Sequence, residues 1–185
     1  MISQLLAQTR ERMDKTIGDL ARSLSTIRTG RASVHLLDHV LVPYYGTLTP
    51  INQLSTLHVP EPSLITIQPW DISQIGEIEK AIRASDLGVN PSNDGRLIRL
   101  PIPPLTQERR QELARQVGKI AEEHRTALRN VRRDSNETLR KASKEKEISE
   151  DEEYRTLAEV QRVTDEFVEK VDALVAQKEQ EILEV

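Results

Sequence analysis

The side chains best suited to chemistry in this chain form a row of arginines between residues 125 and 140. On a helix, Arg125, Arg129, Arg132 and Arg140 fall at i, i+4, i+7 and i+15, which places them on one face beside Arg133, with Asn136 in the gap. Guanidinium groups are planar and permanently charged, they bind phosphate in a bidentate manner, and a straight row of them can follow a nucleic-acid backbone. The pattern therefore indicates an anionic partner.

The charge distribution supports this interpretation and leaves a second one open. Residues 109–146 hold twelve Lys/Arg against six Asp/Glu, residues 147–185 hold four against thirteen, and the whole chain carries a formal net charge of −4. Arginines of the basic segment could therefore pair with the acidic segment on a solvated face, in contacts that contribute little to stability. Antiparallel packing of the first segment could instead add Arg10 and Arg12 to the row.

Other polar and aromatic side chains have simpler interpretations. His124 falls on an apolar helix position, so we expect a packed, hydrogen-bonded histidine. His35, His39 and His58 lack the spacing of metal ligands. Tyr44-Tyr45-Gly46 could be an exposed contact or a cross-strand pair before a turn. The chain has no P-loop, G-x-S-x-G, G-x-G-x-x-G or H-E-x-x-H motif, so we expect a non-enzymatic protein without metal or cofactor.

The amino-acid composition argues against several further classes of protein. The chain has no cysteine, which excludes disulfides, thiolate catalysis and iron–sulfur clusters and suggests a reducing cytoplasm. The first 30 residues contain no apolar signal-peptide region, and no stretch approaches the ~18–20 apolar residues of a membrane span. Only 37% of the residues are apolar and 30% are charged, so the core must be thin and the molecule elongated.

The prolines divide the chain. All nine lie between Pro43 and Pro104, and proline disrupts the interior of a helix. We therefore expect two domains: residues 1–30 with 105–185 as a helical domain, and residues 31–104 as an insert.

The sequence of the helical domain predicts three amphipathic helices. Apolar residues at helical spacing predict a first helix that ends at Thr29 and Gly30, with the glycine as C-cap. Thr106 is a good N-cap for a second helix that reaches about residue 147, and Ser149 to Glu152 form a capping box for a third from residue 150. Three such helices predict an antiparallel bundle, with the start of the first helix near residues 125–133.

The insert reads as a small α+β domain. Strands are expected at residues 38–44, 54–59, 64–68 and 97–100, and a helix at 72–86 that stops at Gly88. Two connections join the insert to the bundle, and such a pair often acts as a hinge, although prolines could equally make it a rigid elbow. The hinge residues would be Gly30, Arg31, Ala32, Pro103, Pro104 and Leu105.

A series of short motifs along the whole chain resembles the bacterial ribosome recycling factor family. The matching segments, in the family's order, are Ile27-Arg28-Thr29-Gly30-Arg31-Ala32-Ser33, Tyr44-Tyr45-Gly46-Thr47, Glu79-Lys80-Ala81-Ile82, Ala84-Ser85-Asp86-Leu87-Gly88, Pro103-Pro104-Leu105-Thr106, Glu108-Arg109-Arg110, Arg129-Asn130-Val131-Arg132-Arg133-Asp134 and Lys146-Glu147-Ile148-Ser149-Glu150-Asp151.

This resemblance implies an L-shaped molecule, with a three-helix bundle as the long arm and a β/α/β domain as the short arm. It implies a cytoplasmic monomer that binds the large ribosomal subunit and its 23S rRNA in the 70S ribosome after peptide release. With elongation factor G, which hydrolyses GTP, it would split the subunits for a new round of translation. The insert would meet elongation factor G, but no residue pattern localises that contact.

The resemblance also implies which arginines face ribosomal RNA: Arg110, Arg129, Arg132 and Arg133, with Arg28 and Arg31 beside the hinge. Arg125 and Arg140 rest on the charge pattern alone. The alternative is an adaptor whose helices bind a protein partner through the acidic third segment. Ribonuclease distinguishes the two, because only RNA-mediated binding is sensitive to it.

Overall fold

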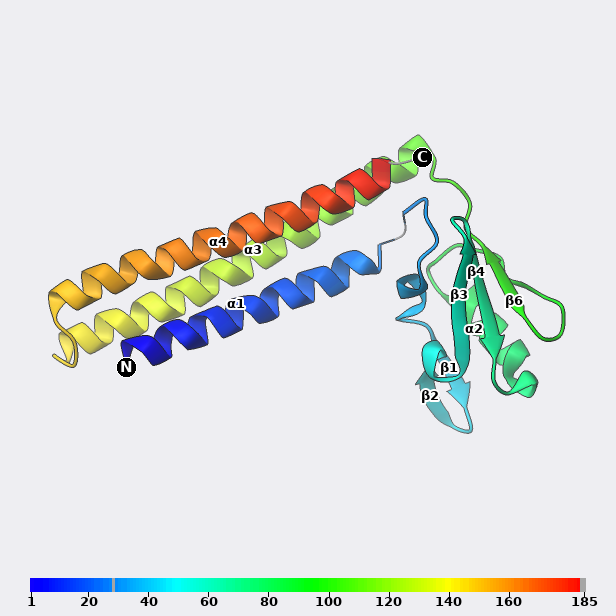
Figure 1. The fold of residues 1–185 in the computed structure, drawn as a ribbon, viewed down its shortest axis with the longest axis horizontal. Coiled ribbons are helices and arrows are strands. Elements are labelled where there is room, and N and C mark those ends of the chain that lie inside the picture. The colour runs from blue at the N-terminus through cyan, green and yellow to red at the C-terminus, as the bar shows by residue number, and fades with distance from the viewer. Residues whose placement is uncertain (28, 184–185) are drawn as a thin grey trace. The chain divides into compact units, whose positions relative to one another are not determined.

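The computed structural model describes residues 1–27 and 29–183 (Figure 1). Contacts between Cα atoms divide the chain into two compact units. One consists of Met1–Leu24 with Arg115–Glu179, and the other runs from Ser25 to Ala114 and includes the chain from Gln180. The domain limits drawn from the prolines, at residues 30 and 105, stay predictions.

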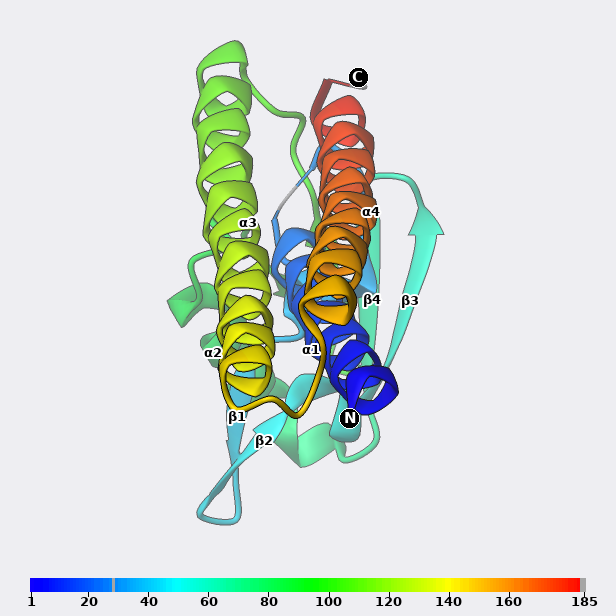
Figure 2. The ribbon, with the colours of Figure 1, turned by 90° about the vertical axis from the view of Figure 1, so that its left-hand side faces the viewer.

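The first unit is built from most of the three expected helices, α1 (Ile2–Ser25), α3 (Gln107–Lys144) and α4 (Glu150–Leu183). They lie side by side in two perpendicular views (Figures 1 and 2). Their apolar stripes meet in a core whose most deeply buried members are Met13, Leu20, Val117, Ala121, Leu128, Leu139, Val160, Phe167 and Val171. The predicted bundle is confirmed, because burial of these stripes is what holds amphipathic helices together.

The axial register of α1 differs from the prediction. Thr9 Oγ1 lies 2.7 Å from Ser135 Oγ, and Ile2 and Leu6 pack against the cluster that contains Leu139. The start of α1 therefore lies beyond residues 125–133, toward the end of α3. The predicted register assumed that α1 continues to Gly30, whereas the helix ends at Ser25.

The predicted C-cap of α1 is also wrong. The helix ends at Ser25, before Thr29 and Gly30. Ile27, which continued the helical spacing, is buried with 5% of its surface exposed, although it lies outside the helix. Periodicity reports which side chains are buried, and a side chain can be buried from an irregular segment as well as from a helix.

Local signals set the other helix ends as expected. Thr106 Oγ1 accepts a hydrogen bond from Arg109 N at 3.2 Å and caps α3. At the start of α4, Ser149 N donates to Glu152 Oε2 at 2.8 Å, and Glu152 N donates to Ser149 Oγ at 3.1 Å. This reciprocal pair is the predicted capping box.

The end of α3 uses a non-glycine residue in the left-handed region. Lys146 has φ +62°. Its N–H donates to Ser143 O at 3.1 Å, and Glu147 N donates to Ala142 O at 2.9 Å. These two bonds define a Schellman motif with Lys146 at the position that usually holds glycine.

The second unit contains the small sheet domain. A hairpin of β1 (Leu41–Tyr44) and β2 (Thr47–Pro50) stands apart from an antiparallel sheet ordered β3-β4-β6-β5, whose strands are Ser55–Glu61, Leu64–Pro69, Ile98–Pro101 and Ser92–Asn93. Helix α2 spans Ile75–Ala84, shorter than the predicted 72–86, because Ile72–Gln74 forms a 3-10 turn and Ser85 ends the helix before Gly88. The four predicted strands are confirmed, and the short strands β2 and β5 were not foreseen.

One face of the four-stranded sheet forms the core of this unit. Ile65 and Ile67 of β4 and Leu100 of β6 are fully buried in one cluster with Ile78 and Ile82 of α2. Side chains alternate across a strand, so the neighbouring residues of β4 and β6 point to the opposite face. With a helical bundle and this sheet domain, the chain has a two-domain α+β fold.

Candidate nucleic-acid interface

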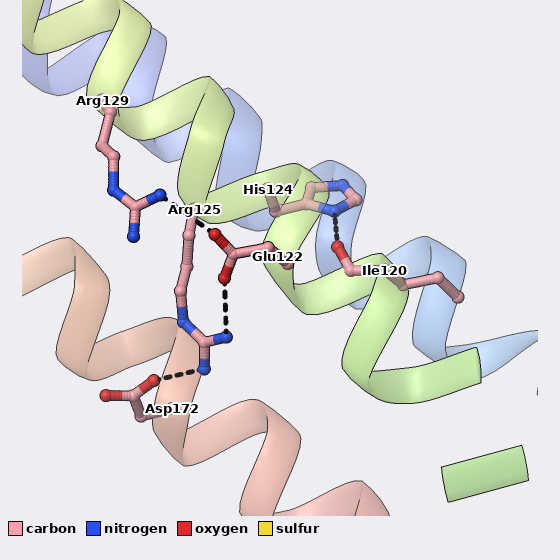
Figure 3. Close-up of polar contacts among 6 residues, drawn as sticks. All are labelled: Ile120, Glu122, His124, Arg125, Arg129 and Asp172. Atoms are coloured by element: carbon pink, nitrogen blue, oxygen red, sulfur yellow. Dashed lines mark hydrogen bonds and ion pairs between the residues drawn. The ribbon is translucent and has the colours of Figure 1, made fainter. Parts of the chain in front are cut away.

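The arginine row lies on α3, but its members differ in their surroundings. Arg125 is the most enclosed of the paired arginines, with 25% of its side chain exposed, and its Nη2 donates to Asp172 Oδ1 of α4 at 2.7 Å (Figure 3). Its bond to Asp172 raises the pKa of Arg125. Arg125 therefore joins two helices, as the interpretation of a paired, solvated face predicts.

Glu122 connects Arg125 and Arg129 on the surface of α3. Arg129 Nη1 donates to Glu122 Oε1 at 3.0 Å, and Arg125 Nη1 lies 3.6 Å from Glu122 Oε2 (Figure 3). The hydrogen bond from Arg129 lowers the pKa of the Glu122 carboxyl group. Half of the Arg129 side chain stays exposed, so a phosphate could reach it and compete with Glu122.

Arg132 and Arg133 retain uncompensated charge. Arg132 Nη1 donates to the neutral amide oxygen of Gln161 on α4 at 3.2 Å, which orients the guanidinium without cancelling its charge. Arg133 is exposed, and no carboxylate contacts it among the residues that the structure describes. With Arg129 on the preceding turn, these side chains form a cationic surface that we call the α3 arginine cluster: Arg129, Arg132 and Arg133.

The remaining predicted arginines are more varied. Arg28 lies outside the described residues. Arg31 is exposed, and its backbone N–H donates to Thr29 Oγ1 at 3.3 Å. Arg110 is half-buried, and its Nε is buried with no hydrogen-bond partner within the described part of the chain. Arg140 is exposed near the turn between α3 and α4. The RNA-facing role of all these residues stays a prediction.

Arg10 and Arg12 are held by carboxylates. Arg12 Nη2 lies 2.7 Å from Asp134 Oδ2 of α3, and Arg10 Nη1 lies 3.3 Å from Glu166 Oε2 of α4. These ion pairs follow from the axial register of α1, and they offset the charge that the two arginines could have added to the row.

The histidines and the tyrosine pair can now be placed. His124 is half-buried, and its Nδ1 lies 2.7 Å from Ile120 O (Figure 3), in agreement with a packed histidine. Among the described residues, no group of His, Asp or Glu side chains could hold a metal ion. Tyr45 is 79% exposed at the tip of the β1–β2 hairpin. Its ring lies edge-on to the ring of Tyr44, with the two ring centroids 4.5 Å apart.

The two connections predicted as a hinge are both bonded to the turn between β3 and β4. Ala32 N donates to Pro62 O at 2.7 Å, and Ile102 N donates to Ser63 O at 2.7 Å. The chain thus enters and leaves the sheet domain at adjacent residues of one turn. Flexion at Gly30 to Ala32 and at Pro103 to Leu105 stays a prediction.

The sequence analysis did not identify Glu122 and Gln161. Glu122 is the carboxylate that pairs with Arg125 and Arg129, and Gln161 is the neutral partner of Arg132. Glu122 lies three and seven residues before Arg125 and Arg129, so helical spacing could have identified it. Gln161 has no such signal, because its contact with Arg132 depends on how α4 aligns with α3.

Comparisons with known proteins agree over the whole chain. A sequence model of the family described as "Ribosome recycling factor" matches residues 20–183. The chain is 54% identical to the ribosome-recycling factor of Desulfatibacillum aliphaticivorans over 184 residues and 54% identical to that of Geobacillus thermodenitrificans over 185 residues, with 100% of both chains covered in each case.

Two solved structures are also similar. A solution structure of the ribosome recycling factor has a TM-score of 0.79 and 40% identity, covering 100% of this chain and 98% of that one. The second is described as models for the Thermus thermophilus factor and the Escherichia coli elongation factor G bound to the E. coli post-termination complex. Its matching chain has a TM-score of 0.70 and 48% identity, with 100% of both chains covered. No helix in the described range is both long and apolar enough to cross a membrane.

Proposed function

Because this chain belongs to the ribosome recycling factor family, whose members are non-enzymatic translation factors, we propose that it binds the post-termination ribosome in the cytoplasm and separates its subunits together with elongation factor G and GTP. A similar structure carries a family member and elongation factor G on the post-termination complex, which supports this choice of partners. The GTP is hydrolysed by elongation factor G, and this chain acts as a monomer.

The observation that carries the proposal is the uncompensated charge of Arg132 and Arg133 in the α3 arginine cluster. Arg132 is held by a neutral amide at 3.2 Å, and Arg133 is exposed without a carboxylate contact in the described structure. Phosphate groups of large-subunit RNA supply the missing anions, since the planar guanidinium matches phosphate geometry. We further propose that Arg28, Arg31 and Arg110 contact RNA.

The mechanism is mechanical. The helical unit holds the large subunit through phosphate contacts, while the two connections at Gly30 to Ala32 and Pro103 to Leu105 act as a hinge for the sheet domain. Elongation factor G pushes against the bound factor and disrupts the bridges between the subunits.

Light scattering of post-termination ribosomes mixed with elongation factor G, GTP and this protein tests the function. Wild type is expected to cause splitting, and Arg132→Ala is expected to slow it. Binding of Arg132→Ala to isolated large subunits should also depend less on salt, by ~0.7–0.9 in the slope of log K against log salt for each lost phosphate contact.

Gln161→Ala is the matched control, because it removes the same bond between α3 and α4 but keeps the arginine. It should split ribosomes at the wild-type rate. Absence of splitting by wild type with active partners would contradict the function. Binding that resists ribonuclease would indicate a protein adaptor.

A further inference from the structure

Glu122 is a carboxylate within a surface that is otherwise suited to bind an anion. It lies on α3, and 57% of its side chain is exposed. Its Oε1 accepts a hydrogen bond from Arg129 Nη1 at 3.0 Å, so it occupies a position at which a phosphate oxygen would meet this guanidinium (Figure 3). Arg129 therefore already has a carboxylate partner in the free protein, whereas the partner of Arg132 is a neutral amide.

The same carboxylate has a second cation within reach. Arg125 Nη1 lies 3.6 Å from Glu122 Oε2, and Arg125 Nη2 donates to Asp172 Oδ1 of α4 at 2.7 Å (Figure 3). Glu122, Arg125 and Arg129 follow one another at spacings of three and four residues, which makes them neighbours on the helix surface. Because the bond to Asp172 ties Arg125 to α4, this guanidinium stays beside Glu122 when Arg129 turns to another anion.

Displacing Glu122 from Arg129 costs little free energy. About half of the Arg129 side chain and more than half of the Glu122 side chain are exposed, and water screens an ion pair of this kind. The released carboxylate also keeps Arg125 as a partner, so its charge is not left without a counterion. A phosphate that binds several guanidinium groups in a bidentate manner makes stronger contacts than this one exposed pair.

We propose that Glu122 is an internal competitor for the α3 arginine cluster: it pairs with Arg129 in the free protein and transfers to Arg125 when an RNA phosphate binds Arg129. The inference rests on the proposed function, because it assigns a regulator to the same RNA-binding surface. Glu122 lowers the affinity of the cluster for RNA, and differences in affinity at one interface appear mostly in the dissociation rate. Release from the large subunit after splitting is therefore faster than it would be with Arg129 unpaired.

Equilibrium binding of the full-length protein to isolated large ribosomal subunits, at one fixed salt concentration, tests the competition. Glu122→Gln keeps the shape of the side chain and should bind about 2- to 5-fold more tightly than wild type, the effect of removing one exposed ion pair. Damage to a binding surface would instead weaken binding, so a purely structural role cannot produce this gain. Equal affinities of Glu122→Gln and wild type would overturn the proposal.

Glu123→Gln is the matched control. Glu123 is also exposed on α3 and carries the same charge, but its side chain leaves the helix about 100° away from that of Glu122. This variant should bind nearly as wild type. An equal gain in both variants would show a general effect of net charge and would refute competition at Arg129.

A double-mutant cycle assigns the effect to Arg129. In an Arg129→Ala background, Glu122→Gln should no longer tighten binding, because the guanidinium that it would release is gone. A gain of the same size in that background would show that Glu122 repels RNA at a distance, and the direct competition would be refuted.

Arg125→Ala tests the transfer of the carboxylate. Without Arg125 the displaced Glu122 loses its second cation, so binding should weaken while the salt slope stays that of wild type. Glu122→Gln in the same protein should abolish this loss. A loss that persists in the double variant would show that Arg125 itself contacts RNA, and the transfer would be refuted.

The failure of this inference differs from the failure of the proposed function. Absence of wild-type binding to large subunits would overturn the function and the inference with it. Weaker binding by Arg132→Ala beside unchanged binding by Glu122→Gln would overturn the inference alone.

Discussion

At the scale of single residues, the arginines of α3 divide between stability and recognition. Arg125 is bonded to Asp172 and lies near Glu122, whereas Arg133 has no carboxylate contact within the described chain. Similar side chains on one helix face thus have different electrostatic surroundings. Substituting these arginines one at a time should therefore separate protein stability from binding to ribosomal RNA.

We expect Arg125→Ala to lower the free energy of unfolding by about 1 kcal/mol or less, because it removes a partly exposed ion pair between α3 and α4. Its binding to large ribosomal subunits should keep the wild-type salt slope. Arg133→Ala should leave stability within about 0.5 kcal/mol and reduce the salt slope by ~0.7–0.9. Urea unfolding measures the stability of each variant, and salt titrations of binding measure its salt slope. A stability loss confined to Arg133→Ala would contradict the assignment of Arg125 to stability and of Arg133 to binding.

The sequence could identify the arginines but not their partners. The positions of Arg125, Arg129, Arg132 and Arg133 follow from helical spacing, which is local. Which of them meets a carboxylate depends on the axial alignment of α4 with α3, and that alignment is set by packing of the whole bundle.

At the scale of elements, the helix ends of the bundle are set by side chains close in sequence. Thr106 and the Ser149–Glu152 capping box could be predicted because each satisfies backbone groups within three residues. Strand β5 could not, because Ser92–Asn93 is only two residues long and is defined by pairing with β6. Such pairing is a tertiary contact with no local pattern.

The Schellman turn after α3 offers a stabilising substitution. Lys146→Gly should raise the free energy of unfolding by about 1 kcal/mol, because glycine adopts a positive φ without the steric cost that lysine bears there. Thermal unfolding followed by helical circular dichroism should show a rise of roughly 2–4 °C. Lys141→Gly, in the last turn of the same helix, is the control and should destabilise by about 0.5–1 kcal/mol. A lower melting temperature for Lys146→Gly would refute this account of the turn.

The capping box of α4 should make bundle stability depend on acid pH. The hydrogen bond from Ser149 N lowers the pKa of Glu152 from its ordinary value of 4.5. A carboxyl group with a lowered folded pKa stabilises the protein above its unfolded pKa, and this contribution is lost as pH falls through the folded value. The difference in stability between wild type and Glu152→Gln should therefore be full at pH 7 and shrink below about pH 4.5.

Thermal melts of both proteins at several pH values between 3 and 7 measure this difference. Glu153→Gln removes a carboxylate from the same turn without touching the Ser149 cap, so its effect should be smaller at pH 7. A difference for Glu152→Gln that stays constant down to pH 3 would exclude the capping carboxylate as the cause.

At the scale of the whole molecule, the entry and exit of the sheet domain meet at one turn. Ala32 is bonded to Pro62, and Ile102 to Ser63, so any bending of the connections takes place outside these two bonds. We propose that these adjacent connections act as a hinge for the sheet domain.

Single-molecule energy transfer can test the hinge, because the chain has no native cysteine. Dyes on Lys141→Cys of α3 and Lys80→Cys of α2 should report a broad distribution of distances in wild type. Changing Pro103 and Pro104 to glycine should broaden it further, since proline restricts the backbone. One narrow distribution in both proteins would instead indicate a rigid elbow.

The bundle joins the first helix of the chain to the last. Arg10 of α1 pairs with Glu166 of α4, 156 residues later. A ribosome adds about 5–20 residues per second, so α1 is synthesised roughly 8–30 s before this partner exists. Met13 and Leu20, fully buried in the finished protein, cannot be covered by α4 during that interval. The nascent chain therefore exposes the apolar face of α1, a target for chaperones, until α4 has been synthesised.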